Sequence, residues 1–376
     1  MRVRLLYIKS KILKVLKLSG YLALVEIFLI KQILEVLIMK AMYLKEPGTI
    51  VEKDIPKPDI NEEGLLVEIK QVGVCGSDIE YYETGKIGEF VVEEPLILGH
   101  ESAGVVADVG EKVENFETGD KVALEPGIPC RKCKHCKEGK YNLCPNVNFM
   151  ATPPIDGTFT EYFAQPADFA YRLPDSISLE EGALMEPLSV GIHAARRGNV
   201  DLGDSVAVLG AGPIGLVTMQ SAFAAGASKV IITDIVDFRL EKAKDLGATD
   251  AINVQKDDLK DLYGEFDKVL QTAGTSDTYE EAMHLVDRGG KVVQVGTPSA
   301  DELNIDPNEP ITREFDILGA FRYANTYQDA INLVHSDTIS LKPLISKTFP
   351  LEETEEALIY SSENPEKSIK TMVEIS

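Results

Sequence analysis

The chain has 376 residues, 44% of them apolar, and carries a net charge of −23 at pH 7. This length is sufficient for two domains with their own cores, and the apolar content is ordinary for a globular protein. The negative charge argues against a nucleic-acid-binding protein, because no basic face could offset the charge of the phosphate backbone.

Residues 1–38 differ from the rest of the chain, because they are basic and rich in Leu and Ile. Every apolar run that could span a membrane is interrupted by charge, at Lys17, Glu26, Lys31 and Glu35. No cleavage site for a secretory signal is visible, whereas a transit peptide over residues 1–20 stays open. The simplest interpretation is a start codon assigned too early, with the protein beginning at Met39 or Met42. We therefore expect residues 1–38 to lie outside the fold, and no association with a membrane.

The segment 39–188 is expected to form a β-barrel-like domain. Short runs rich in Val, Ile and Leu alternate with Gly, Pro and Asp, which is typical of strands joined by turns. The clearest runs are Leu65–Val72, Ser102–Val109 and Lys121–Leu124.

Two groups of metal-ligand residue types lie in this first domain. Cys75 follows the first of these strands, in a turn, and His100 and Glu101 open the second. A Cys/His/carboxylate set on Zn²⁺ leaves one coordination position open for chemistry. The sequence therefore suggests a catalytic zinc ion at these three residues.

The second group is a C-x2-C-x2-C-x7-C cluster formed by Cys130, Cys133, Cys136 and Cys144. Four thiolates at such close spacing predict a closed, structural zinc site, and the nearby lysines partly offset their charge. His135 lies in the same loop but is expected to be a bystander, because four sulfurs complete a tetrahedron. Thiolate ligands need a reducing compartment and no secretion-type disulfide pattern is present, so we expect a cytoplasmic protein.

From about residue 204 the pattern changes to alternating strands and helices. Strands are expected at Ser205–Leu209, Lys229–Thr233, Ala251–Asn253, Lys268–Gln271 and Lys291–Val295, with helices at Pro213–Ala225 and Arg239–Leu246. This alternation predicts a parallel, doubly wound sheet over residues 189–321. The alternation stops after Phe321, so residues 322–376 are expected to return to the first domain.

The first strand–helix turn of this second domain carries the motif G-x-G-x-x-G, from Gly210 through Gly212 to Gly215. The glycines permit a tight turn, close approach of a pyrophosphate and close packing of helix on strand. Asp234 ends the next strand, where a carboxylate accepts hydrogen bonds from the adenosine ribose and repels a 2′-phosphate. The sequence therefore predicts NAD rather than NADP as the cofactor.

With these motifs in place, residues 39–376 resemble the medium-chain zinc-dependent dehydrogenases. The segment His100-Glu101-x2-Gly104-x5-Gly110-x2-Val113 matches the zinc signature of that family. Within the family, three segments are similar to the polyol group, which includes sorbitol (L-iditol) and xylitol dehydrogenases: Ala151–Pro154, Met185–His193 and Phe321–Thr326. The resemblance implies an α/β protein with a GroES-like β-barrel catalytic domain and a Rossmann domain.

The same resemblance implies roles for individual residues. Cys75, His100 and Glu101 would hold the catalytic zinc, and Glu186 would hold a water or the metal. The implied substrate-pocket positions are Tyr81, Phe149, Thr152, Glu186, Arg322 and Tyr323. The implied cofactor contacts, added to the three glycines, are Pro213, Ile214, Asp234, Arg239, Ala273, Gly274, Val295, Gly296 and Thr297.

The resemblance also implies the reaction: oxidation of a polyol at a secondary carbon to the ketose, with hydride transfer to NAD. We expect the proton to leave by way of Ser77 and Glu186. Many relatives carry a histidine five residues after the zinc cysteine, whereas this chain has Glu80, so either this carboxylate or another group would relay the proton there. A homo-oligomer, a tetramer as in many relatives, is expected.

Other functions stay open from the sequence. The zinc and NAD residues also fit a butanediol, threonine or sugar-phosphate alcohol dehydrogenase, and only the segments at Ala151 and Arg322 favour a polyol. A catalytically silent NAD-binding protein is the alternative outside enzymes, but such a protein would be expected to lose ligands that this chain retains.

Overall fold

The computed structural model describes residues 37–298 and 306–376. Of residues 1–38, the structure describes only residues 37 and 38. The interpretations given above for this segment therefore concern residues that lie outside the described part. Strand β1 begins at Ile38. Across the described ranges, we find no helix whose length and apolar character would suit it to crossing a membrane.

The first domain is built around a seven-stranded, mostly antiparallel sheet with the order β12-β8-β7-β3-β20-β19, and β11 also pairs with β3. Its strands are β3 (Gly64–Gly73), β7 (Glu101–Val109), β8 (Lys121–Leu124), β11 (Tyr162–Pro166), β12 (Ala170–Arg172), β19 (Ile345–Pro350) and β20 (Lys370–Glu374). A three-stranded sheet contains β1 (Ile38–Glu46), β2 (Thr49–Pro56) and β6 (Leu96–Ile97), and two short ladders contain β4 (Lys86–Ile87), β5 (Phe90–Val91), β9 (Gly127–Ile128) and β10 (Asn148–Phe149).

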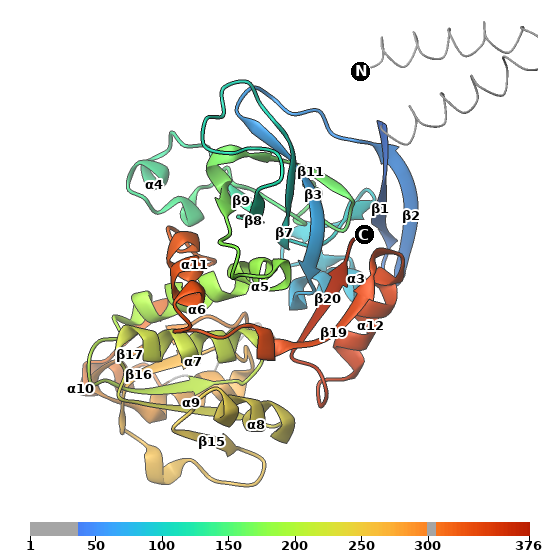
Figure 1. Ribbon diagram of the computed structural model, residues 1–376. Coiled ribbons are helices and arrows are strands. Elements are labelled where there is room, and N and C mark those ends of the chain that lie inside the picture. Colours follow the sequence, from blue (N-terminus) through green and yellow to red (C-terminus); the bar gives the residue numbers. More distant parts are fainter. Residues whose placement is uncertain (1–36, 299–305) are drawn as a thin grey trace, which may run out of the picture.

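Alternation along β3 explains the core of this domain. Leu65, Val67 and Ile69 have no exposed surface and pack into one apolar cluster. Helix α12 (Thr354–Glu363), from the C-terminal segment, adds Ala357 and Leu358 to the same cluster. Figure 1 shows β20 beside β3, and α12 next to β19 and β20, so the C-terminal segment completes the domain with which the described chain begins. The other helices of this part are α3 (Gly76–Thr84), α4 (Lys134–Lys137) and α5 (Leu179–Ala183).

The second domain has a six-stranded parallel sheet with the order β15-β14-β13-β16-β17-β18. Its strands are β13 (Ser205–Leu209), β14 (Lys229–Asp234), β15 (Asp250–Asn253), β16 (Phe266–Gln271), β17 (Val286–Gln294) and β18 (Asp316–Gly319). Its helices are α6 (Met185–Gly198), α7 (Pro213–Ala225), α8 (Asp237–Asp245), α9 (Ser276–Leu285), α10 (Asn308–Arg313) and α11 (Tyr327–His335).

Both faces of this sheet are covered. Val206 and Val208 on β13 pack in the apolar cluster of α6, α7 and α8, whereas Ala207 and Leu209 pack in the cluster of α9. Buried residues therefore run continuously along the strand, as expected of a parallel sheet between two helical layers. The predicted fold class, a GroES-like domain followed by a doubly wound Rossmann sheet, is confirmed.

Several predicted elements differ in their boundaries, most of them by one or two residues, and two of these differences have a clear physical reason. Helix α8 begins at Asp237, two residues before the expected start, because Asp237 occupies the first turn, where a carboxylate suits the helix dipole. Strand β17 begins at Val286 rather than Lys291, and its residues Asp287–Gly289 are exposed. A search for apolar runs misses such a polar strand end. Cys75, expected in a turn, is the N-cap residue of α3.

Candidate active site

The three predicted ligands of the catalytic metal converge in space. Sγ of Cys75, a ring nitrogen of His100 and a carboxylate oxygen of Glu101 lie within 4.8 Å of one another. Cys75 caps α3 just after β3, and Glu101 is the first residue of β7, the strand that pairs with β3. In that pairing Gly73 lies opposite Glu101, and a Cβ at Gly73 would collide with the Glu101 carboxylate. Glycine at position 73 therefore leaves space for the carboxylate of Glu101.

A buried carboxylate, Asp78, holds the two ligand loops together. It accepts hydrogen bonds of 2.9 Å from the backbone N–H groups of Cys75 and Gly99. Its Oδ1 lies 3.7 Å from Nδ1 of His100, which leaves Nε2 free to face a metal. Burial opposes the charged imidazole, but Asp78 and Cys75 raise the pKa of His100 well above its ordinary value. Surroundings this anionic also favour a metal cation.

Lys370 of β20 is a neighbour of this centre that the sequence did not indicate. Its Nζ donates to both oxygens of Glu101 at 2.7 Å and to the carbonyl of Val74 at 2.9 Å, and the residue is only 3% exposed. Burial alone would lower the pKa of Lys370, but Glu101 and Cys75 raise it. A carboxylate has lone pairs enough for both a lysine and a metal, so the donor set of sulfur, nitrogen and oxygen still fits Zn²⁺.

We predict that Lys370→Met lowers stability mainly in the metal-free protein. Removing one partner of a buried ion pair costs about 3–5 kcal/mol because the other charge stays unpaired. A zinc ion at Glu101 would compensate that charge. Relative to the original chain, the variant should therefore melt at a much lower temperature in the presence of a chelator, and at a slightly lower temperature when zinc is bound. Lys367→Met, at an exposed lysine, is the matched control and should change neither value. An equal loss with and without zinc would contradict this account.

Glu186 lies in the first turn of α6 and is 5% exposed. The hydroxyl of Tyr323 donates to its Oε1 at 2.9 Å. Burial raises the pKa of Glu186 to about 7; the charge of His100 lowers it and that of Glu101 raises it. A carboxyl group with this pKa can take up or release a proton near neutral pH.

The predicted substrate-pocket residues surround the same cluster. The ring of Phe149 lies 5.7 Å from that of His100, and the guanidinium carbon of Arg322 lies 3.7 Å above the Phe149 ring. Tyr81 is buried, which raises its pKa, and the side chain of Thr152 and the charge of Arg322 oppose this shift. The structure therefore brings together residues from α3, β10 and the segment after β18.

Ser77 and Glu80, two residues with a predicted part in proton transfer, differ in their exposure to solvent. Ser77 is half-buried on the first turn of α3, two residues after Cys75. Glu80 is exposed on the same helix. A carboxylate at the surface can exchange protons with solvent, but its role stays a prediction.

The four cysteines of the second cluster also converge. Their sulfur atoms lie within 4.8 Å of one another, with 3.3 Å between Cys133 and Cys136 and 4.0 Å between Cys130 and Cys136. Four sulfurs about 2.3 Å from a tetrahedral zinc would be separated by about 3.8 Å. All four are free of disulfides. Backbone amides of Lys132 and Cys133 lower the pKa of Cys130 to about 6, whereas burial and the neighbouring thiols raise the pKa of Cys136 to about 12. The spacing of the four sulfurs fits a structural zinc, whose charge would favour the thiolate form of all four.

The glycine motif has the geometry that a dinucleotide needs. Gly210 has φ of 101°, which side chains disfavour, and a Cβ at Gly215 would collide with the Gly210 carbonyl. Gly212 caps α7, and a Cβ there would meet nothing within 4 Å. Open space therefore lies in front of the helix N-terminus, where a pyrophosphate binds. Pro213 and Ile214 form the first turn of that helix.

The remaining predicted cofactor residues lie at the same edge of the sheet. Asp234 accepts a 2.7 Å hydrogen bond from the N–H of Ala211, and Arg239 lies 4.0 Å from its carboxylate. The loops after β16 and β17 touch, because a Cβ on Gly274 would meet the Thr297 carbonyl. The other members of these loops are Ala273, Val295 and Gly296. A cavity of about 470 Å³ lies between residues 254–259 and α9 and is also lined by Leu209 and Thr233, each of which precedes a predicted cofactor residue, although none of the predicted cofactor residues lines it. This edge is the topological switch point at which doubly wound sheets bind nucleotides.

Glu125, which immediately follows β8, is a further buried group that the sequence analysis did not include. It is 1% exposed and accepts 2.8 Å hydrogen bonds from the hydroxyls of Tyr141 and Tyr171. Burial raises the pKa of Glu125 to about 7, against the effect of the two tyrosines, which lower it.

This pKa predicts a specific pH dependence of stability. An unfolded glutamic acid titrates near pH 4.5, so between about pH 4.5 and 7 the folded chain binds the extra proton and stability falls as the pH rises. From about pH 5.5 to 7 the loss is about 2 kcal/mol. The glutamine in Glu125→Gln does not titrate. The melting temperature of this variant minus that of the original chain should therefore increase as the pH rises from about 5.5 to 7. A difference that does not vary with pH would contradict the shifted pKa.

Comparison with known proteins agrees with this geometry. The family model of the alcohol dehydrogenase GroES-like domain matches residues 61–175, and that of the zinc-binding dehydrogenases matches residues 213–336. The chain is 43% identical to a sorbitol dehydrogenase of Bacillus subtilis, covering 89% of this chain and 97% of the relative. It is 42% identical to a probable D-xylulose reductase A of Aspergillus clavatus, covering 85% and 92% of the two chains.

A solved structure is similar over almost the same range. An oxidoreductase/dehydrogenase of unknown specificity involved in membrane biogenesis, from Escherichia coli, superimposes with a TM-score of 0.85 at 38% identity. The match covers 90% of this chain and 99% of the other.

Proposed function

This chain belongs to the medium-chain zinc-dependent dehydrogenases, and we propose that it oxidises a polyol such as sorbitol or xylitol at a secondary carbon to the ketose, with NAD as hydride acceptor. The observation that carries the polyol assignment is the position of Arg322. Its guanidinium lies over the ring of Phe149, and that ring lies next to His100. Only Phe149 therefore separates this charged hydrogen-bond donor from a predicted metal ligand. The names of the sorbitol dehydrogenase and xylulose reductase relatives support the same substrate class.

Zinc fits the donor atoms of Cys75, His100 and Glu101, and NAD fits the open N-terminus of α7. When bound, zinc lowers the pKa of a substrate hydroxyl and NAD accepts a hydride from the adjacent carbon. The chain's own residues would orient the substrate and move its proton. In this proposal Glu186 accepts the proton at Oε2, because Oε1 already accepts the Tyr323 hydroxyl.

The path of the proton from Glu186 to solvent is proposed to include Ser77, which lies half-buried close to Cys75 on α3. Arg322, Tyr81 and Thr152 would bind the hydroxyl groups farther along the polyol. A simple alcohol lacks those hydroxyls, so these residues would distinguish the two substrates.

Asp234 is proposed to select NAD over NADP. Its carboxylate accepts the backbone amides of Ala211, Ile235 and Val236 and lies at the end of β14, where a ribose would donate to the remaining lone pair. We predict that Asp234→Ala lowers kcat/KM for NAD by about 10- to 100-fold, through loss of charge-assisted hydrogen bonds, while kcat/KM for NADP falls less or increases. Asp237→Ala, at an exposed aspartate on α8, should leave the ratio unchanged. Equal losses for both cofactors would count against this role.

A substrate panel tests the proposed function. NADH formation would be measured with sorbitol, xylitol, ribitol, galactitol, 2,3-butanediol and threonine, each with NAD and with NADP. Turnover of a pentitol or hexitol with NAD is the expected result. Turnover of butanediol or threonine alone would overturn the substrate assignment, and no turnover of any compound would favour an NAD-binding protein without catalysis.

We also propose a homo-oligomer, a tetramer by resemblance to relatives, in the cytoplasm. The compartment is supported by the five cysteines, all of which are free thiols in positions suited to metal ligation. Sedimentation of the purified protein would give the number of subunits.

A further inference from the structure

The segment Phe321–Asn325, here called the substrate arm, joins β18 to α11 and carries Arg322 and Tyr323. Its backbone is in a conformation that it would not adopt alone. Arg322 has φ of 52° and Asn325 has φ of 56°, both in the left-handed region that non-glycine residues disfavour. Phe321 is 55% exposed, so burial of its side chain does not hold this end of the arm. Contacts from elsewhere must impose the conformation.

Most of those contacts come from the loop of the four cysteines, residues 130–144, here called the cysteine lobe. Arg196 of α6 also donates to the carbonyl of Asn325 at 3.0 Å, and the side chain of Tyr323 is buried. Nδ2 of Asn142 donates to the carbonyl of Phe321 at 2.8 Å. The backbone N–H of Asn325 donates to the hydroxyl oxygen of Tyr141 at 2.8 Å, and its side-chain Nδ2 donates to the carbonyl of Gly139 at 2.7 Å. The lobe therefore holds the arm on both sides of Arg322, although the two segments are about 180 residues apart in the sequence.

The lobe is itself fixed at the point where it binds the arm. The Tyr141 hydroxyl donates to Oε1 of Glu125, and Tyr171 donates to Oε2 of the same carboxyl group. Because the single hydroxyl proton of Tyr141 points to Glu125, the hydroxyl oxygen faces the Asn325 amide as an acceptor. The buried Glu125 thus sets the orientation of the residue that holds the arm.

The arm in turn reaches the metal ligands. Arg322 lies over Phe149, Tyr323 donates to Glu186, and one small pocket is lined by Glu125, Tyr141, Asn142, Phe149, Arg322 and Tyr323 among others. We infer that Asn142 and Tyr141 are positioning residues that place Arg322 in the polyol pocket, so that the cysteine lobe determines selectivity for long polyols over short alcohols. This inference rests on the proposed function.

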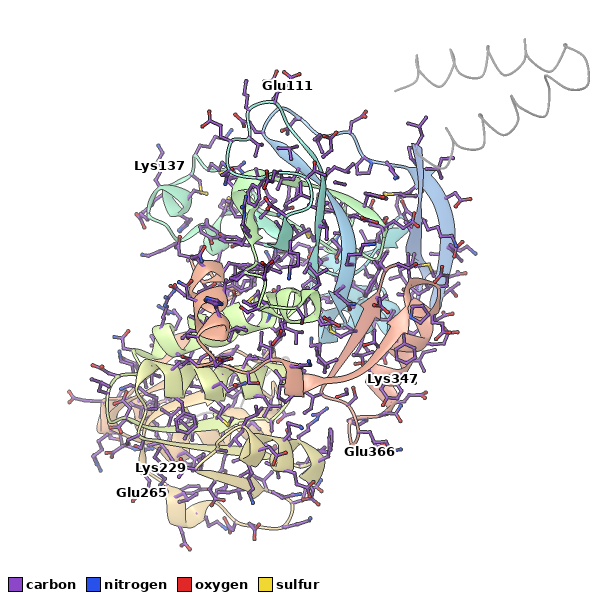
Figure 2. All side chains as sticks on the ribbon, viewed as in Figure 1. Glu111, Lys137, Lys229, Glu265, Lys347 and Glu366 are labelled. Atoms are coloured by element: carbon purple, nitrogen blue, oxygen red, sulfur yellow. The ribbon has the colours of Figure 1, made fainter. Side chains whose placement is uncertain are left out.

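The test is a double-mutant cycle between the lobe and Arg322. Asn142→Ala is expected to lower kcat/KM for a hexitol about tenfold, mainly through KM, and to change kcat/KM for 2,3-butanediol less than threefold, because butanediol lacks the distal hydroxyls. In an Arg322→Ala background, Asn142→Ala should have less than a twofold further effect. Lys137→Ala is the matched control, because Figure 2 shows this side chain on the outer edge of the same lobe.

A merely structural role predicts a different pattern. Asn142→Ala would then lower kcat/KM equally for the hexitol and the diol, or would lower it by the same factor in the Arg322→Ala background as in the original chain. Either result would overturn the inference.

Hydrogen exchange gives a readout that does not depend on turnover. Tyr141→Phe removes the acceptor of the Asn325 amide, so exchange of that amide should accelerate tenfold or more, while amides of β13 keep their protection. Unchanged exchange at Asn325 would show that the lobe does not hold the arm. If the original chain oxidises no polyol, the proposed function fails, but this measurement still decides whether the lobe holds the arm.

Discussion

His100→Ala is expected to lower turnover of the polyol by about 10⁴-fold, which corresponds to about 5.5 kcal/mol of lost transition-state stabilisation. His100 supplies the nitrogen donor among the three converging ligands, and Asp78 lies beside its ring. Without it, only Cys75 and Glu101 would remain, and two protein ligands are fewer than the three that catalytic zinc sites use. The zinc ion should therefore be lost from this site.

The measurement combines initial rates with metal content. The variant should hold one zinc per chain, at the cysteine lobe, and should bind NAD as the original chain does, because the glycine motif lies in the other domain. His135→Ala is a matched control, since His135 lies in the lobe beside a complete set of four sulfurs. Retention of two zinc ions and of turnover by His100→Ala would contradict the assignment.

Glu186→Gln is expected to lower kcat by about 10²- to 10³-fold, the usual contribution of a positioned general base. The substitution keeps the shape of the side chain and an acceptor for the Tyr323 hydroxyl, but it removes the group that takes the proton. Glu180→Gln, on the neighbouring helix α5, should keep normal activity.

The pH profile adds a second readout for the same residue. The carboxylate must be ionised to accept a proton, so kcat should rise with pH through the pKa of Glu186. Burial raises this pKa to about 7, and a metal cation at the neighbouring ligands would lower it, so the rise should occur at or below pH 7. This limb should disappear in Glu186→Gln. An unchanged profile would assign the proton transfer to another group.

The parts of the site that the sequence predicted are those with local spacing. The four cysteines lie within fifteen positions, and the glycine motif lies within six, so their meaning does not depend on the rest of the fold. Cys75 and His100 are farther apart, but Cys75 follows the end of β3 and His100 precedes the start of β7, the strand that pairs antiparallel with β3, and a strand pattern indicates both positions. For the same reason the strands with apolar runs were predicted well.

The residues that the sequence did not indicate act over long separations. Lys370 is 269 positions from Glu101, and a lysine in a C-terminal strand is normally expected to face solvent. Its burial follows only from the return of β20 to pair with β3. Glu125 and Tyr141 likewise acquire their roles when the cysteine lobe meets the substrate arm. The left-handed backbone conformation of Arg322 could not be predicted either, because no pattern of residue types in the sequence indicates it.

The most direct test of the account is zinc titration of the chelator-treated protein, followed by NADH formation from sorbitol or xylitol. The account predicts no turnover without metal. It also predicts recovery as the second zinc per chain binds, after the four-cysteine site is filled, and no recovery in His100→Ala. Full turnover by protein free of zinc, or equal recovery in His100→Ala, would contradict it.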